Sequence, residues 1–259
     1  MTAPLLQLRG VTKRFGGLVA NAQIDLEVRP GEIVGVIGPN GAGKTTLFDV
    51  ITGYYPPTAG EILFRNQRIN GLSPDRINRL GIARTFQKLR PFLEMTTLEN
   101  VMVAALPRCA SLAEAETTAD EALRFVGLEE RRHVLATGLS TGQRKRLELA
   151  RAMVTRPALL LLDEVTGGVD QRSIPGLLDL VQRLRAKEVT LLVIEHNMRV
   201  IMALADRVIA LHLGRLIAAG PPLEVAQSPG LREAYFGKTH ARDYQTGGKI
   251  RRVSGALGS

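Results

Sequence analysis

The sequence predicts an α/β protein whose core is a parallel sheet covered by helices on both faces. Short apolar runs rich in Val, Ile and Leu alternate with segments of helical periodicity, as in sheets joined by helical crossovers. Runs that are apolar at every position indicate strands buried on both faces. The strands are expected at 33–37, 158–162, 189–195 and 206–211, and the accompanying helices at 45–51, 173–187 and 198–204.

The N-terminal segment has a different pattern. Residues 5–28 contain alternating, β-rich patches, which are typical of short antiparallel strands. A Pro-Gly turn at 30–31 precedes the first parallel strand, and a further strand pair is expected across 60–69. We therefore expect an N-terminal antiparallel β-subdomain beside the parallel core.

Residues 91–153 interrupt the alternation of strands and helices. Helical periodicity at 97–105, 113–126 and 142–153 predicts an α-helical subdomain inserted into the core. The whole of 1–237 is expected to form a single domain, and 238–259 a basic, flexible tail.

Charge and composition argue against a nucleic-acid partner. The net charge is +9, but residues 237–259 alone carry five Lys or Arg against one acid. Aromatic residues make up 4% of the chain and Trp is absent, so platforms for stacking single strands are not evident. We expect no binding to nucleic acid.

The chain also lacks the sequence features of a membrane-spanning or secreted protein. Its longest apolar runs, such as 101–106, are six residues, whereas a membrane-spanning helix needs about 20. No apolar stretch near the N-terminus resembles a secretory signal. A single cysteine, Cys109, excludes an internal disulfide and fits a reducing compartment. We expect a protein of the cytosol or of the cytosolic side of a membrane.

A glycine-rich loop follows the strand expected at 33–37. It matches the phosphate-binding pattern G-x-x-x-x-G-K-T and reads Gly38-Pro39-Asn40-Gly41-Ala42-Gly43-Lys44-Thr45-Thr46. Gly41 and Gly43 permit the backbone turns that point successive N–H groups at an anion. Lys44 supplies charge for the β- and γ-phosphates, and the Thr45 hydroxyl suits Mg²⁺. The sequence therefore predicts a P-loop NTPase core that binds a nucleoside triphosphate.

Two acids follow the strand expected at 158–162. Asp163 stands where parallel sheets place their ligands, and its carboxylate can hold Mg²⁺ beside Thr45. Glu164, the next residue, is suited to orient or deprotonate an attacking water. A solvated turn is the alternative for two such acids, but the phosphate-binding loop favours the catalytic role.

Several separated motifs resemble the ATP-binding cassette (ABC) family. The segment 139–143 is similar to its L-S-G-G-Q signature, and further landmarks occur in the family's order from residue 5 to 237. These are Phe15 after the first strand, Gln87 in Arg84-Thr85-Phe86-Gln87, His196 after Val193-Ile194-Glu195, and Asp170 in Gly168-Val169-Asp170. Thr141, Val165 and Val169 depart from the commonest residues of these motifs, and none of the three removes a catalytic group.

The resemblance implies that each ATP is clamped between two subunits. The phosphate loop of one subunit would face the signature of the other, where Ser140, Gly142 and Gln143 begin a helix that favours the γ-phosphate. Asp170 would bridge the two subunits. The cofactors implied are ATP and Mg²⁺.

The resemblance also assigns roles to three other side chains. Phe15 would stack on adenine, Gln87 would contact the metal and water and sense a permease, and His196 would bond the γ-phosphate and position Glu164 or the water. Taken singly, each has a plainer interpretation, as a core aromatic, a surface glutamine or a structural histidine.

Within the family, several stretches are similar to bacterial importer ATPases for branched-chain amino acids. They include 84–87, 95–104, 194–198, 205–208 and 233–237. That branch implies a second ATPase subunit, paralogous or identical, two membrane permease subunits, and indirectly a periplasmic substrate-binding protein. The expected location is the cytoplasmic face of the bacterial inner membrane, as a peripheral subunit.

Other functions remain open at this stage. Related importers handle urea, amides or aromatic acids, an exporter ATPase shares the fold, and some soluble cassettes act on DNA or ribosomes. The last class is disfavoured because Lys44 and Ser140 are not separated by a long coiled coil and the chain carries one cassette.

Overall fold

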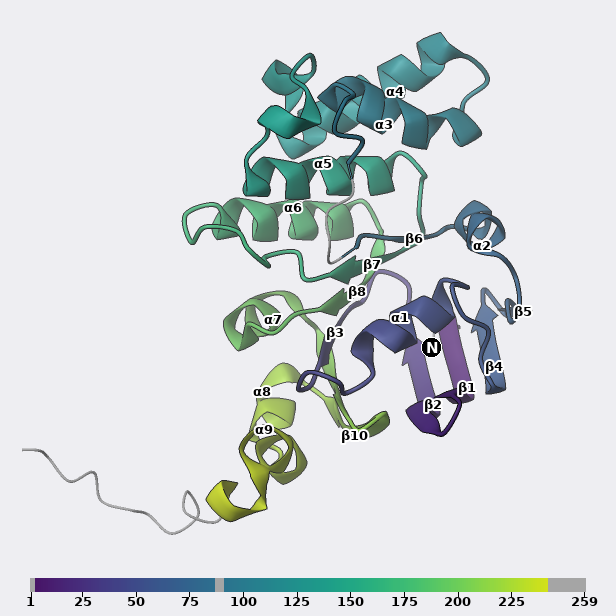
Figure 1. The fold of residues 1–259 in the computed structure, drawn as a ribbon, viewed down its shortest axis with the longest axis vertical. Coiled ribbons are helices and arrows are strands. Elements are labelled where there is room, and N and C mark those ends of the chain that lie inside the picture. The colour runs from purple at the N-terminus through teal and green to yellow at the C-terminus, as the bar shows by residue number, and fades with distance from the viewer. Residues whose placement is uncertain (1–2, 87–90, 242–259) are drawn as a thin grey trace, which may run out of the picture.

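The computed structural model describes residues 3–86 and 91–241, and it confirms the predicted α/β class. Its strands form one mainly parallel and one antiparallel sheet, with helices packed around them (Figure 1). Among the helices of this described part, none is long and apolar enough to cross a membrane.

The larger sheet has the strand order β10-β9-β3-β8-β7-β6. All neighbours in it run parallel except β10, which pairs antiparallel with β9 at one edge. The bounds are β3 Ile33–Ile37, β6 Ile82–Arg84, β7 Leu159–Asp163, β8 Thr190–Ile194, β9 Arg207–His212 and β10 Arg215–Gly220.

Both faces of this sheet are buried, which explains why its central strands are apolar at every position. Along β3, Ile33 and Ile37 pack into the core shared with helices of residues 97–204, whereas Val34 and Val36 pack into the core on the opposite face. That second core also contains residues of α1, Lys44–Ile51, and of the antiparallel sheet. Successive side chains of a strand point to opposite faces, so a continuous apolar run supplies both cores.

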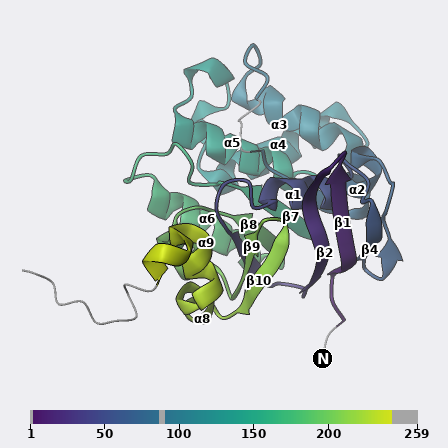
Figure 2. The ribbon, with the colours of Figure 1, turned by 60° about the horizontal axis from the view of Figure 1, so that its bottom comes forward.

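The antiparallel sheet has the order β2-β1-β4-β5 and lies beside α1 (Figure 2). Its strands are β1 Leu6–Phe15, β2 Leu18–Val28, β4 Ala59–Phe64 and β5 Gln67–Arg68. β1 and β2 form a hairpin longer than the patches expected from the sequence, with Phe15 opposite Leu18 at its tip.

The predicted helical subdomain contains α3 Thr97–Ala105, α4 Leu112–Val126 and α5 Thr141–Met153, so these helix predictions are confirmed within one residue. α3 begins at a capping box in which Thr96 and Glu99 bond each other's backbone N–H groups. α4 ends at Gly127, whose φ of 71° is favourable for glycine. β6 and β7 are parallel neighbours, so α3–α5 are inserted between two adjacent strands of the sheet (Figure 1).

Several elements were not predicted from the sequence. They are β6, β10, α2 Pro74–Leu80, α8 Pro222–Gln227 and α9 Pro229–Ala241, whereas α6 Ile174–Ala186 and α7 Met198–Leu204 match predicted helices. α9 extends past Gly237, so helical structure enters the segment that we expected to be a tail. Residues 242–259 lie outside the described part of the chain.

Candidate nucleotide-binding and hydrolysis site

The phosphate-binding loop connects β3 to α1 and borders a cavity of about 420 Å³. The cavity is open to one side and brings together segments far apart in the sequence. Its lining includes Asn40, Gly41, Ala42, Gly43, Lys44, Thr45 and Thr46 of the loop, Glu164, Ile194 and His196 from the sheet edge, and Leu18, Val19 and Ala20 of the β1–β2 hairpin. Its volume is within the usual range of small-molecule sites.

Close packing requires glycine at the end of the loop. Gly43 has φ 99°, and an added Cβ would lie 2.3 Å from the carbonyl oxygen of Ala20. The fully buried Asn21 donates from Nδ2 to the carbonyl oxygen of Gly43 at 3.1 Å. The hairpin therefore braces the loop from the side, a contact that sequence reasoning missed because Asn21 belongs to no motif.

Lys44 points back along its own loop. Its Nζ donates to the carbonyl oxygens of Gly38 at 2.7 Å and Pro39 at 3.0 Å, and its side chain is buried. Burial lowers the pKa of Lys44, while the carboxylates of Glu164 and Asp163 act in the opposite direction. The ammonium group is therefore held at the loop with anionic neighbours, where a phosphate chain would gain most from a positive charge.

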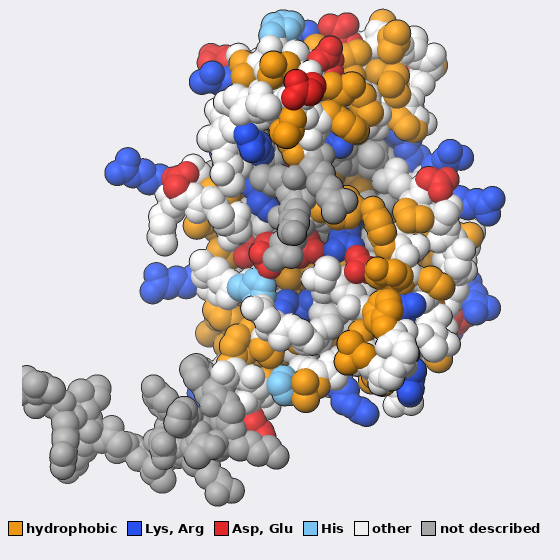
Figure 3. Space-filling view, viewed as in Figure 1, with side chains coloured by type: hydrophobic (Ala, Val, Ile, Leu, Met, Phe, Trp, Pro, Cys, Tyr) orange, Lys and Arg blue, Asp and Glu red, His pale blue; other side chains and the backbone are white. Residues whose placement is uncertain are grey.

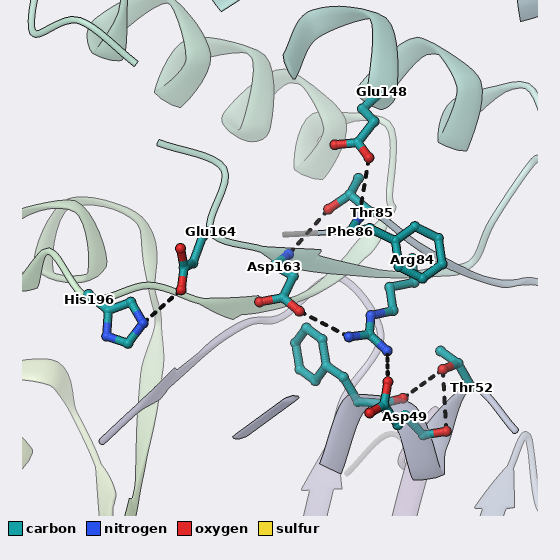
Figure 4. Close-up of polar contacts among 10 residues, drawn as sticks. Asp49, Thr52, Arg84, Thr85, Phe86, Glu148, Asp163, Glu164 and His196 are labelled. Atoms are coloured by element: carbon teal, nitrogen blue, oxygen red, sulfur yellow. Dashed lines mark hydrogen bonds and ion pairs between the residues drawn. The ribbon is translucent and has the colours of Figure 1, made fainter. Parts of the chain in front are cut away.

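Asp163 ends β7 and is 1% exposed. Its Oδ2 accepts a hydrogen bond from Arg84 at 3.0 Å, and the same guanidinium pairs with Asp49 of α1. Burial raises the pKa of Asp163, and the bond from Arg84 partly offsets that effect. Figure 4 shows the other carboxylate oxygen of Asp163 turned away from Arg84. Arg84 thus links this acid to α1, the helix that follows the phosphate loop, a role that its sequence motif does not predict.

Glu164 faces His196 at the start of the loop after β7 (Figure 4). Its Oε1 lies 2.7 Å from Nε2 of His196, and its backbone has φ 53°, which is uncommon for a residue other than glycine. The buried Lys145 of α5 donates to the carbonyl oxygen of Glu164 at 2.7 Å. The structure therefore brings the two predicted catalytic residues into contact, and the bond from Lys145 stabilises the uncommon backbone conformation of Glu164.

The oxygen donors near the loop fit Mg²⁺. The Thr45 hydroxyl in the first turn of α1 and the Asp163 carboxylate at the end of β7 are hard ligands, and Mg²⁺ takes such ligands together with water and phosphate oxygens. Within residues 3–86 and 91–241, no cluster of three or more His, Cys, Asp or Glu forms a metal site of its own. The third predicted ligand, Gln87, lies outside the described residues.

The signature residues do not line this cavity. Ser140 is the N-cap of α5, where its Oγ accepts from the Gln143 N–H at 3.3 Å and Gln143 Oε1 accepts from the Ser140 N–H at 2.9 Å. Gly142 lies in the first turn of α5, packed near Ser173. Asp170 lies just before α6 and accepts from Ser173 Oγ, of the N-cap residue of that helix, at 2.7 Å; this bond lowers the pKa of Asp170. None of these side chains shares the cavity with the phosphate loop of its own chain.

Phe15 lies at the tip of the β1–β2 hairpin and is 40% exposed. Its ring packs edge-on with Tyr55, with centroids 5.1 Å apart. Leu18, Val19 and Ala20, which follow it in the hairpin, reach the cavity lining. Phe15 itself is not part of the cavity lining, but it lies opposite Leu18 in the hairpin, and Leu18 does line the cavity.

The comparisons with known proteins decide the family. The family model described as "ABC transporter" matches residues 22–167. The chain belongs to the ATP-binding cassette family. This cassette is 41% identical to the "High-affinity branched-chain amino acid transport ATP-binding protein LivG" of Escherichia coli K12, over 92% of this chain and 100% of that protein. It is an ATPase of the transporter type, and ATP is its substrate.

Solved structures agree with the fold of this cassette. The ADP conformation of MJ1267, an ATP-binding cassette of an ABC transporter, superposes with a TM-score of 0.83 at 31% identity, covering 92% of this chain and 100% of that one. A dimeric post-hydrolysis state of the cassette MJ0796 bound to ADP and Pi superposes with a TM-score of 0.76 at 28% identity, covering 84% and 98%.

Proposed function

We propose that this chain is the ATPase subunit of a bacterial importer for branched-chain amino acids. The protein LivG, which is named for that transport, matches along its whole length. The chain would pair with a second cassette beneath two permeases at the cytoplasmic face of the inner membrane, as a peripheral subunit, with a periplasmic binding protein delivering the substrate.

One observation supports the proposed pairing of two cassettes. The cavity has the phosphate loop and the predicted catalytic pair, but Ser140, Gly142 and Gln143 lie elsewhere on the chain. The N–H groups at the start of α5 are suited to an anion, so a second cassette would supply its own signature to this cavity. The dimeric cassette that binds ADP and Pi supports this arrangement.

Hydrolysis in such a pair follows from the side chains present. The loop N–H groups and Lys44 would bind the phosphates, and Thr45 and Asp163, with Gln87, would hold Mg²⁺, which neutralises charge on the phosphate oxygens. Glu164 would orient a water and take its proton as the water oxygen attacks the γ-phosphorus. The bond to the β–γ bridging oxygen then breaks and leaves ADP. His196 would hold Glu164 in place, as its 2.7 Å contact indicates.

The permease contact is proposed for an apolar turn, residues 92–95, and the neighbouring face of α3. Phe92 and Leu93 are 46% and 45% exposed, and Figure 3 shows hydrophobic side chains gathered at the top of the molecule, where α3 and α4 lie in Figure 1. The fully buried Asn100 builds this turn, because its amide donates to the carbonyl oxygens of Phe92, Met95 and Thr96 and accepts from the Phe92 N–H. Exposed apolar residues on a rigid turn are suited to a protein partner.

Reconstitution tests this proposal. The chain would be co-expressed with the permease, partner ATPase and binding protein of a branched-chain amino acid importer from the same organism, and the complex placed in liposomes. ATP inside the vesicles should drive uptake of labelled leucine, with urea, an amide and an aromatic acid as competing substrates. ATP-driven uptake of one of those compounds without leucine would reassign the substrate, and the absence of any complex with the permeases would contradict the importer role.

A further inference from the structure

The side chain of Lys13 is buried beside two aromatic rings. Lys13 lies near the end of β1 and is 9% exposed, although lysine is seldom buried without a charged partner. Its Nζ donates to the carbonyl oxygen of Pro56 at 3.0 Å. Among the residues that the structure describes, no carboxylate forms an ion pair with it. The charge is instead satisfied by a carbonyl oxygen and by aromatic rings.

Two rings receive this cation. The Lys13 ammonium lies 4.8 Å from the centroid of Phe15 and 5.3 Å from that of Tyr55, both within the range of cation–π attraction. The two rings pack at 84° to each other. Lys13 therefore contacts both members of the pair, while 40% of Phe15 stays exposed and accessible to a ligand.

Backbone hydrogen bonds connect the Phe15–Tyr55 pair to α1, the helix that follows the phosphate loop. Tyr55 and Pro56 follow α1, and the Tyr55 N–H donates to the carbonyl oxygen of Asp49 in that helix. The Thr58 N–H donates to the carbonyl oxygen of Thr12, which ties this segment to β1. Phe15 is thus held at a set position relative to the residues that bind phosphate, through Lys13 and the segment 54–58.

We propose that Lys13 is a positioning residue for ATP binding, which holds the Phe15–Tyr55 pair as a preformed platform for the purine base. This inference rests on the proposed stacking role of Phe15. An aromatic side chain at a hairpin tip would otherwise have to be immobilised when the base binds, and that ordering weakens binding. Lys13 removes that cost before the nucleotide arrives.

The test uses the full chain and the variant Lys13→Met, which keeps the length of the side chain and removes its charge. The KM for ATP should rise roughly three- to tenfold, the range that immobilising one side chain corresponds to, while kcat stays unchanged. Binding of inorganic tripolyphosphate, which has no base, should not change. Lys13→Arg should restore most of the ATP affinity, since it keeps the cation.

Lys187→Met is the matched control. Lys187 also lies over a ring, 5.2 Å from the centroid of Phe125, but that ring belongs to α4 and does not line the nucleotide cavity. Its removal should leave the binding of both ligands unchanged. If Lys13→Met weakens ATP and tripolyphosphate equally, or changes neither, Lys13 does not position the base platform.

Phe15→Ala separates this inference from the function on which it rests. Loss of ATP affinity in Phe15→Ala with no effect of Lys13→Met would overturn the role of Lys13 alone. Unchanged ATP affinity in Phe15→Ala would overturn the stacking role of Phe15 and, with it, the platform.

Discussion

The phosphate cavity and the signature region differ in how completely one chain builds them. Around the cavity, the predicted site residues are bonded to several other elements: Arg84 joins Asp163 to α1, Asn21 bonds Gly43, and Lys145 bonds Glu164. The signature at the start of α5 satisfies its own helix cap and reaches no part of that cavity, and the apolar turn beside α3 stays exposed. The residues of the first region are thus positioned within one chain, whereas the second region leaves groups available for the further subunits that we propose.

The largest expected effect is that of Glu164→Gln, which should remove most ATP hydrolysis and leave ATP binding intact. Turnover should fall by about 10²–10⁴-fold, the usual contribution of a general base, because the amide cannot take a proton from water. ATP affinity should stay near normal, since the phosphate contacts are intact. Release of inorganic phosphate and equilibrium binding of ATP measure the two effects, and near-normal turnover would remove Glu164 from the role of base.

Lys44→Ala should instead weaken the binding of ATP. Charge-assisted hydrogen bonds to phosphate are lost, and we expect ATP affinity to fall roughly 10- to 100-fold. Calorimetric titration with ATP checks this, and Lys187→Met serves as a control that removes a lysine elsewhere. An unchanged affinity would contradict the function assigned to the phosphate loop.

Leu93→Ser tests the proposed permease contact at the apolar turn. Leu93 is 45% exposed in the apolar turn, so the ATPase activity of the isolated chain should be unaffected, whereas transport by the reconstituted complex should fall by roughly tenfold if Leu93 is an anchor of the interface. The control is Leu223→Ser in α8, where the leucine is 65% exposed on the opposite end of the molecule (Figure 1). Equal loss in both variants would mean that the turn is not the permease contact.

Glu148→Gln should change stability and its dependence on pH, without acting on ATP or on the permease contact. Glu148 accepts a hydrogen bond from the Phe86 N–H, and burial raises its pKa from 4.5 to about 7, against the opposing effects of Lys145 and Arg151. The folded protein binds this proton more tightly than the unfolded chain, so stability falls as pH rises from about 4.5 to about 7 and then levels off.

Glutamine keeps an acceptor for Phe86 and carries no charge, so Glu148→Gln should relieve that loss. Relative to the parent, the variant should gain on the order of 3 kcal/mol at most at pH 8, and little near pH 4.5. Thermal unfolding at both pH values measures the difference. A constant difference between the two proteins across this range would mean that Glu148 does not titrate there.

The sequence by itself determined those parts of the protein whose residues are neighbours in the chain. The phosphate loop, the acids 163–164 and the signature are contiguous, and each follows a strand or begins a helix whose apolar pattern is clear. Such local patterns predicted the α/β class, the helices α3–α5 and the presence of a nucleotide site. The strands β6 and β10 were not predicted. β6 has only three residues and β10 is a partly exposed edge strand, so neither has a clear hydrophobic pattern in the sequence.

Only the tertiary structure decided how the site is supported and where it ends. Arg84 meets Asp163 across 79 positions of sequence, Asn21 meets Gly43 across 22, and Lys13 meets Pro56 across 43. No local periodicity specifies such pairs, because their partners approach only when two sheets and α1 pack together. The separation of the signature from its own phosphate cavity is likewise a property of the packed chain, and it is the physical reason why a second subunit is proposed.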